Sequence, residues 1–468
     1  MVFSSLFFIF AFLVLCYGIY LFAPSIKAKN TVLLVFSLIF YAWGGPPLVL
    51  LLCLETLVCF VGAHLIWSCN PAPFHGEGGK GGKKAFLAIT VGMCLALLVI
   101  YKYTGFFTDT FCALFGLENL IPKVALPIGI SFYTFQILSY VVDVYRGDAK
   151  VQKNIVDLLL YISFFPQLIA GPIVKYHDID LQIADRTLTA EGCARGVRRF
   201  VVGLAKKLLL ANACGLIADT AFGAENPGTA LAWLGAVAYC LQIYHDFSAY
   251  SDMAIGLGAM FGFAIPENFR YPYMSGSVQE FWRRWHISLS TWFKEYLYIP
   301  LGGNRCSRAR KLFNKIVVFF STGLWHGASF SFILWGLWHG AFLILEDFVK
   351  PTKKKWLSVL WRPVTLFAVL FGFVLFRAES LGVAVHYLAA MFTAGPITSA
   401  FASCVQGYDL FMLAVAAVFS LPVIPWIRSR LSERTSEIVG YAAGAALFAV
   451  CVITLSSTTF NPFIYFRF

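Results

Sequence analysis

Apolar stretches make up most of the chain and are separated by short polar loops. Several of them approach the roughly 20 residues that an α-helix needs to cross a bilayer. The stretch 31–67 is interrupted by Gly-Gly-Pro-Pro at 44–47, and because two prolines cannot continue a helix, we expect a helical hairpin there. The pattern predicts helices near residues 2–23, 31–67, 85–104, 125–145, 155–173, 199–217, 230–243, 251–264, 316–348, 356–376, 409–427 and 436–456.

The composition makes lipid the better solvent for this chain. Of its 468 residues 59% are hydrophobic and only 13% are charged, whereas an ordinary globular domain carries about 25% charged residues. So little charge cannot cover a soluble protein of this size, so we predict an all-α fold with a single integral-membrane domain over residues 1–468. The first apolar segment has no preceding basic residue, which favours an uncleaved transmembrane helix over a signal peptide.

The basic residues are concentrated in a subset of the loops. The net charge is +12, and basic cytoplasmic loops account for it without a nucleic-acid partner. The positive-inside rule assigns these loops to the cytoplasm and both chain termini to the outside. Segments 218–229 and 393–408 lack basic residues and are assigned to the outside. The basic clusters lie at 27–29, 80–84 (in a glycine-rich loop, 76–84), 146–153, 195–207, 305–315, 350–355 and 428–434.

Two histidines fall in a predicted re-entrant hairpin. The loops at 305–315 and 350–355 are both basic and hence both cytoplasmic, so the segment between them must enter the membrane and return. Each arm of about 17 residues reaches roughly 25 Å, which is short of a full crossing. His326 and His339 would lie roughly 16 Å deep, each within Gly-Leu-Trp-His-Gly. An ionisable group at that depth is costly, so both are functional-site candidates.

Two further polar clusters interrupt the apolar pattern. One is YHDFSAYSD at 244–252, and the other is FWRRWHISLS at 281–290. The tryptophans of the second suit a membrane interface and its arginines favour phosphate or headgroup contact, so we expect this segment to lie partly in the cytoplasmic interface. The residues concerned are Trp282, Trp285, Trp292, Arg283 and Arg284.

These clusters suggest general-base chemistry. A neutral, buried His326 would take a proton from a hydroxyl while that oxygen attacks a thioester carbonyl. His286 would orient His326 or bind the acyl carrier. In the alternative interpretation, the histidines hydrogen-bond neighbouring helices and only hold the bundle together.

Metal binding and ion transport are two other interpretations. A metal site would use His245, His286, His326 and His339, but no pair has the i, i+4 spacing of a helical zinc site, so we expect no metal. The twelve cysteines form no Cys-x-x-Cys pair, and we expect them to pack in the interior.

A transporter would use Asp246 and Asp252 as ion sites, whereas the structural alternative pairs them with Arg270 or backbone donors. Transporters often contain internal repeats, and none is evident here. The sequence also lacks a Gly-x-Ser-x-Gly elbow and a Walker loop, which argues against a serine hydrolase or an ATP-driven pump.

Seven short motifs follow one another along nearly the whole chain. They are MVFSS at 1–5, LPIGISFYTF at 126–135, SFFPQLIAGP at 163–172, FWRRWHISLS at 281–290, YIPLGGNR at 298–305, GLWHG at 323–327 and YFRF at 465–468. Together they resemble the membrane-bound O-acyltransferase family, and within it the bacterial members that act in alginate and peptidoglycan O-acetylation. No single motif is specific, but the combination is.

The resemblance implies a fold and a set of site residues. The fold would be a ring of about 11 transmembrane helices, with re-entrant and interfacial helices, around a central tunnel. The family's catalytic histidine falls on His326 and its second characteristic polar position on His286. The expected donor-binding or tunnel-lining residues are Trp325, Trp285, Arg283, Arg284 and Ser290.

The resemblance also implies a reaction and its partners. The donor would be acetyl-CoA from the cytoplasm, with no permanently bound cofactor. Members of this branch usually pass the acetyl group to a separate extracytoplasmic serine-hydrolase-like partner, which acetylates a polysaccharide acceptor. We therefore expect a multi-pass protein of a bacterial inner membrane, in contact with the lipid bilayer and not with nucleic acid.

Two departures and three alternatives stay open. The family pattern usually has Phe where this chain has His245 and Gly where it has Ala249, so His245 is assigned no role. The alternatives are D-alanyl transfer to teichoic acid from a carrier-protein thioester, a transporter, and a structural assembly subunit. The identity of the polysaccharide and the choice between proton transfer and acyl carriage by His326 are also open.

Overall fold

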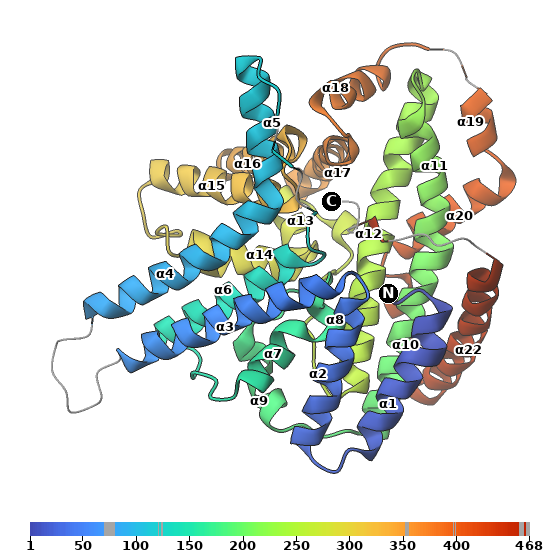
Figure 1. Cartoon of the computed structure of the whole chain (residues 1–468). Coiled ribbons are helices and arrows are strands. Elements are labelled where there is room, and N and C mark those ends of the chain that lie inside the picture. Colours follow the sequence, from blue (N-terminus) through green and yellow to red (C-terminus); the bar gives the residue numbers. More distant parts are fainter. Residues whose placement is uncertain are drawn as a thin grey trace. The chain divides into compact units, whose positions relative to one another are not determined.

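The structure is a computed structural model that describes residues 1–69, 80–119, 121–122, 125–351, 355–395, 397, 399–457 and 463–464. Within these ranges every element of regular structure is a helix (Figure 1), which confirms the all-α prediction. Residues 76–79 of the glycine-rich loop, the lysines at 353–354 and the YFRF motif lie outside the described residues, whereas residues 80–84, predicted as part of that loop, begin a helix.

The chain forms two compact units, each described separately. Unit 1 contains residues 1–197 and 254–266, and unit 2 contains residues 198–253 and 267–468. The division falls within two helices, α10 (Ala190–Ala205) and α12 (Gly228–Met260).

Unit 1 consists of helices joined mostly by short turns. α2 ends at Ala42 and α3 begins at Pro46, so the hairpin predicted from the Gly-Gly-Pro-Pro sequence is confirmed. Gly45 adopts φ 147°, a conformation that only glycine tolerates well. The elements are η1 (Phe8–Phe12), α1 (Leu13–Phe22), α2 (Ile26–Ala42), α3 (Pro46–Ser68), α4 (Lys80–Leu98), η2 (Val99–Tyr103), α5 (Thr104–Phe115), α6 (Ile130–Arg146), α7 (Ile155–Ser163), α8 (Phe165–Leu168) and α9 (Tyr176–Ala184).

Unit 2 contains the three histidines singled out by the sequence. They lie on or beside α14, α15 and α16. The elements are η3 (Lys206–Ala211), α11 (Asn212–Gly223), η4 (Pro272–Met274), α13 (Val278–Arg284), α14 (Ile287–Phe293), η5 (Lys294–Tyr298), α15 (Arg308–His326), α16 (Phe330–Val349), α17 (Lys355–Arg377), α18 (Leu381–Ala390), α19 (Ser399–Cys404), α20 (Gly407–Phe419), α21 (Val423–Arg428) and α22 (Glu433–Ser457).

The hairpin predicted over 316–348 consists of two packed helices, α15 and α16. Its re-entrant course stays a prediction, and α16 is longer than the predicted arm and is long enough to cross a membrane. Glycines let the backbones of the two helices touch. A side chain at Gly336 would overlap the carbonyl oxygen of Phe319, and one at Gly323 would overlap that of Phe332. Ser329 begins α16 by accepting a hydrogen bond from the backbone N–H of Phe332 at 3.4 Å. The turn between the arms is therefore only three residues long, 327–329.

The prediction of separate helices at 230–243 and 251–264 is wrong. α12 runs without a break through the polar segment 244–252. The polar residues do not end the helix because its buried acids have cationic partners: Asp246 contacts Lys207 at 2.5 Å and Asp252 contacts Lys206 at 2.6 Å. The ion pairs thus allow a buried helix to contain acidic residues, which a pattern of apolar positions alone does not predict.

Three other boundaries differ from the pattern. The stretch 155–173 is divided into α7 and α8 at Phe164, and 409–427 is divided into α20 and α21. The helix predicted at 85–104 continues through η2 and α5 to Phe115. The sequence pattern missed α18, whose ten residues are too few for a span.

Six helices in the described part of the chain are long and apolar enough to cross a membrane. The protein is therefore a multi-pass membrane protein, whereas the ring of about 11 helices and the tunnel remain predictions. The six candidate spans are Pro46–Ser68, Gly82–Phe115, Ala190–Gly223, Phe330–Val349, Trp356–Arg377 and Glu433–Ser457.

The glycine contact within the hairpin generates a stability prediction. Gly336→Ala places a methyl group against the carbonyl of Phe319, and forcing the helices apart should cost about 1–3 kcal/mol. We expect a lower thermal unfolding temperature in detergent. Gly92→Ala is the matched control, because a methyl group there meets nothing within 4 Å. Equal unfolding temperatures for wild type and Gly336→Ala would contradict the close backbone packing.

Candidate active site in unit 2

Three buried histidines are linked by aromatic side chains. Trp335 lies between two of them, with ring centroids 4.9 Å from His326 and 5.3 Å from His339. Trp325 lies 4.9 Å from His326 and 5.9 Å from His286. The structure thus gathers into one cluster three histidines that are up to 53 positions apart in the sequence (339 minus 286).

His326 is the last residue of α15, and its side chain is 6% exposed. The helix ends there because Gly327 adopts an extended conformation with φ −166°. The ring is enclosed by Trp325, Trp335 and Phe376, whose centroid is 5.1 Å away. The C-terminal end of a helix favours positive charge, so this position would stabilise an imidazole that accepts a proton.

His286 is held in an unusual backbone conformation directly before α14. Its φ of 42° lies in the left-handed region, which costs energy for a residue other than glycine and is often found at functional sites. Its Nδ1 lies 3.2 Å from Oδ1 of Asn268. That oxygen also accepts hydrogen bonds from the Ser288 hydroxyl at 2.9 Å and the Ser288 backbone N–H at 3.2 Å. Asn268 therefore fixes the ring of His286.

The chemical state of His286 follows from its burial. The residue lies outside the six candidate spans and is fully buried. Burial lowers the pKa of His286 to about 3, so the imidazole is neutral at ordinary pH. With Nδ1 donating to Asn268, Nε2 carries a lone pair, and no partner for it lies among the described residues.

His339 lies in α16 and is completely buried. Trp282 packs against its ring with centroids 5.2 Å apart. Neither ring nitrogen has a hydrogen-bond partner within the part of the chain that the structure describes. Gly372 on α17 leaves room for the ring, because a Cβ there would lie 2.6 Å from Nε2 of His339. His339 is thus a buried polar group with unused hydrogen-bonding capacity, which is uncommon and points to function.

The other site residues predicted from the sequence, Arg283, Arg284, Trp285 and Ser290, lie on or next to α13 and α14, close to His286 in the sequence. Arg283 is exposed, and Arg284 forms an ion pair with Glu280 on its own helix at 2.7 Å. Trp285 is buried against Phe281 and other aromatic rings. Ser290 is half-buried, and its backbone N–H donates to the carbonyl of His286 at 3.0 Å. Roles in donor binding for these four residues stay predictions.

Several residues of the cluster were not singled out by the sequence. Asn268 and Gly372 carry no recognisable pattern, since one lies in a loop and the other inside an apolar helix. Trp335 could have been found, because it is four residues before His339 and residues at that spacing share a helix face.

The polar residues of segment 244–252 bind other elements of unit 2. Asp246 also accepts the backbone N–H of Ile464 at 2.7 Å, and His245 contacts the Ala416 carbonyl at 2.8 Å. Asp252 contacts both Lys206 and Arg199. Pairing of the acids with Arg270 or backbone donors was one of the two interpretations of this segment. The backbone donor is confirmed for Asp246, and the cationic partners are Lys207, Lys206 and Arg199 and not Arg270.

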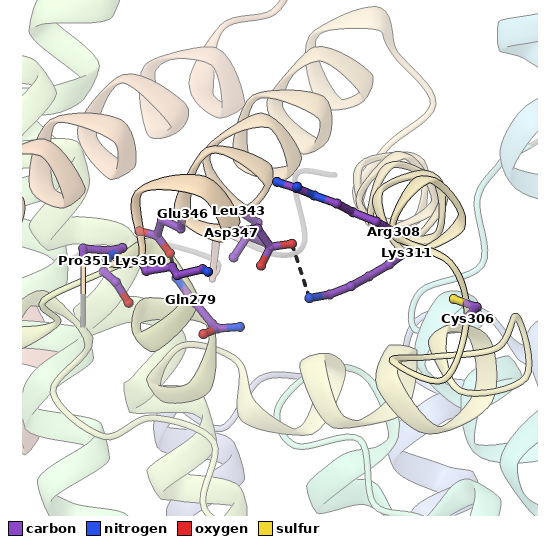
Figure 2. Close-up of a pocket in the computed structure, with 10 residues that line it drawn as sticks. Gln279, Cys306, Arg308, Lys311, Leu343, Glu346, Asp347, Lys350 and Pro351 are labelled. Atoms are coloured by element: carbon purple, nitrogen blue, oxygen red, sulfur yellow. Dashed lines mark hydrogen bonds and ion pairs between the residues drawn. The ribbon is translucent and has the colours of Figure 1, made fainter. Parts of the chain in front are cut away.

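A cavity of about 550 Å³ lies between the open end of the hairpin and the start of α13 (Figure 2). Arg308 and Lys311 project into it from α15, and Lys350 lines it at the end of α16. Asp347 contacts Lys315 at 2.7 Å and Lys311 at 3.5 Å. Three of the ten lining residues are cationic and two, Glu346 and Asp347, are acidic; because the cations outnumber the acids, we call it the cationic cavity. The other lining residues are Ser277, Gln279, Cys306, Leu343, Glu346 and Pro351.

His326 and the cationic cavity lie at opposite ends of α15, whereas His339 is four residues before Leu343, which lines the cavity. The 18 residue steps from Arg308 to His326 span roughly 27 Å along a helix. No group of three His, Cys, Asp or Glu residues in the described ranges is arranged to hold a metal ion. The site is thus a buried imidazole site with a separate anion-attracting cavity, in a multi-pass membrane protein.

Comparison with known proteins identifies the family. The model of the membrane-bound O-acyltransferase family matches residues 145–383, which include all three histidines. The chain is 39% identical over 496 residues to the probable alginate O-acetylase AlgI of Pseudomonas putida, with 100% of both chains covered. It is 34% identical over 434 residues to the peptidoglycan O-acetyltransferase of Helicobacter pylori, covering 84% of this chain and 80% of that one. The protein belongs to the membrane-bound O-acyltransferase family and is an O-acyltransferase.

Asn268 offers a test of how the site is held. Asn268→Ala removes the hydrogen-bond partner of Nδ1 of His286 and frees the ring to rotate. We expect acyl transfer to fall about 10- to 100-fold with the protein still folded, as for other groups that orient a functional imidazole. The control is Asn119→Ala, which removes a surface amide that contacts Thr108 and Asp109. Wild-type transfer rates in Asn268→Ala would remove His286 from the site.

Proposed function

We propose that this protein moves an acetyl group from cytoplasmic acetyl-CoA for the O-acetylation of an extracytoplasmic polysaccharide, directly or through an exported partner. The observation that carries the proposal is the buried cluster of His286, His326 and His339. The names of the two relatives support the substrate class, since one acts as an O-acetylase of alginate and the other as an O-acetyltransferase of peptidoglycan.

In the proposed reaction His326 acts as the general base. The imidazole takes the proton of an acceptor hydroxyl while the hydroxyl oxygen bonds to the thioester carbonyl carbon. The carbon–sulfur bond then breaks, and the proton passes to the leaving thiolate, which gives an ester and a free thiol. The position of His326 at the end of α15 would stabilise the transient imidazolium. Trp325 and Trp335 would exclude water from the thioester.

The cationic cavity supports a phosphorylated donor such as acetyl-CoA. Arg308, Lys311 and Lys350 would contact the phosphates, because guanidinium and ammonium groups bind phosphate oxygens strongly. This requires the basic loops to face the cytoplasm of a bacterial inner membrane, as the positive-inside rule predicts. It also requires a passage from the cavity to His326, which the proposed helix ring with its central tunnel would supply.

The acceptor would be reached from the other side of the membrane. The proposal includes an exported serine-hydrolase-like partner, which would receive the acetyl group and acetylate the polysaccharide. This division of labour fits the sequence, which contains no serine-hydrolase motif of its own.

A second candidate is D-alanyl transfer to teichoic acid. The chain is 28% identical over 279 residues to the teichoic acid D-alanyltransferase of Bacillus subtilis, which covers 54% of this chain. The donor in that case would be a carrier-protein thioester. Ion transport has less support, because Asp246 and Asp252 are already paired with cationic side chains.

The role of His326 can be tested in membrane vesicles. Labelled acetyl-CoA is supplied at the cytoplasmic face, together with any exported partner encoded beside this protein. Wild type should transfer label to partner or carbohydrate, and His326→Ala should lower the rate at least about 100-fold, because it removes a general base. Variants are compared at matched protein level and thermal stability. His386→Ala is the control, since this histidine is exposed and contacts only the Glu225 carbonyl in the described part of the chain.

Each result of this assay decides between candidates. Equal transfer by wild type and His326→Ala would make His326 structural and overturn the site assignment. Transfer from a D-alanyl carrier protein but not from acetyl-CoA would favour the second candidate. No transfer from either donor, with the partner present, would overturn acyl transfer by this site.

A further inference from the structure

Glu346 joins two elements of the site through its carboxylate. It lies near the end of α16, and its side chain is 8% exposed. One oxygen accepts the backbone N–H of Val278 at 2.6 Å, and the other accepts that of Gln279 at 2.9 Å. Trp361 on α17 donates its indole N–H to the first oxygen at 3.0 Å. The carboxylate is therefore held between three helices.

The contact completes the N-terminus of α13. The first N–H groups of a helix have no partner within it. Ser277 is the N-cap and accepts the N–H of Glu280 at 3.0 Å. The Glu280 side chain in turn accepts the N–H of Gly276, just before the cap, at 2.9 Å. The N–H groups of Val278 and Gln279 lie between these two, and Glu346 satisfies both from a different helix. A negative charge is also favourable at this end of a helix.

The other end of α13 leads directly to the histidine cluster. The helix has seven residues and is only about 10 Å long. Its Trp282 packs on the ring of His339 at 5.2 Å. After α13 the chain passes through Trp285 to His286, which begins α14. A shift of this short helix on α16 would therefore move Trp282 and His286 relative to His326.

We propose that Glu346 is a positioning residue for acyl transfer, and that its carboxylate anchors α13 to α16 and so keeps His286 and Trp282 in register with His326 and His339. The inference rests on the proposed function, because it concerns the rate of that reaction. Glu346 acts through α13 and contacts none of the three histidines in the described ranges.

Glu346 lies beside the cationic cavity, so a role in donor binding has to be distinguished from a role in positioning α13. Glu346 lines this cavity together with Gln279 (Figure 2). If its role were to bind the donor, its loss would raise the KM for acetyl-CoA. If it positions α13, its loss should lower kcat, because the donor still binds but the reacting groups are misplaced.

The test uses Glu346→Gln in the full-length protein. The amide keeps one accepting oxygen and replaces the other with an NH₂ group that faces a backbone N–H. We expect kcat to fall about 10- to 100-fold, with the KM for acetyl-CoA changed less than about twofold. In hydrogen exchange, the amides of residues 278–288 should exchange about tenfold faster than in wild type, as expected for the loss of one charge-assisted hydrogen bond.

Two further variants keep the test decisive. Trp361→Phe removes only the indole donor to Glu346 and should give a smaller change in the same direction, even if Glu346→Gln folds poorly. Ser380→Ala removes the cap of α18, whose hydroxyl accepts the Val383 N–H at 3.3 Å. It is the matched control for a lost helix cap and should leave kcat and exchange at 278–288 unchanged.

The outcomes separate this inference from the proposed function. An unchanged kcat in Glu346→Gln at wild-type thermal stability would overturn it, as would a lower kcat without faster exchange at 285–288. A raised KM alone would assign Glu346 to the donor cavity instead. If wild type transfers nothing from acetyl-CoA, the proposed donor fails, while the exchange measurement still shows whether Glu346 anchors α13.

Discussion

The direct backbone contact between α15 and α16 is the constraint on which the site depends. Gly323 and Gly336 bring the two backbones into contact, so Trp335 on α16 can reach the ring of His326 on α15 as well as that of His339 on its own helix. Side chains at the glycine positions would separate the arms and with them the histidines. Small residues permit such close approach of helices inside a membrane, where packing takes the place of the hydrophobic effect. The arrangement of the histidines therefore depends on the close contact between the backbones of α15 and α16.

Two sets of buried ionisable groups in unit 2 differ in how they are paired. Asp246 and Asp252 contact lysine and arginine side chains, and such pairing offsets part of the cost of burying the charges. The imidazoles of His286 and His339 keep nitrogen atoms with no partner in the described ranges. A polar atom that is buried and left unpaired destabilises the fold, which a reacting substrate would offset by hydrogen bonding. The acids are thus part of the framework, and the histidines are the chemical candidates.

Much of this arrangement could be predicted from the sequence, and there are physical reasons why the other features were missed. Basic loops on both sides of 316–348 were enough to predict the hairpin, and the Gly-Leu-Trp-His-Gly sequences within it identified His326 and His339. The continuity of α12 was missed because a pattern of apolar positions does not record that Lys207 neutralises Asp246 across the fold. Asn268 and Glu346 were missed for a similar reason, since each acts on a backbone or ring that is distant in sequence. Arg283 and Arg284 were chosen from their charge, and in the structure Arg283 is exposed and Arg284 is paired with Glu280.

Transfer of the acyl group at His326 is the central proposal. The most direct measurement is an experimental structure of the protein with a non-transferable analogue of acetyl-CoA, in which the thioester sulfur is replaced. We expect the analogue's carbonyl carbon to lie beside the His326 imidazole, where an acceptor oxygen held by that imidazole would be about 3–3.5 Å from it. We also expect phosphates near Arg308 and Lys311. An acetyl group bound away from the three histidines, for example beside Asp246, would contradict the proposal.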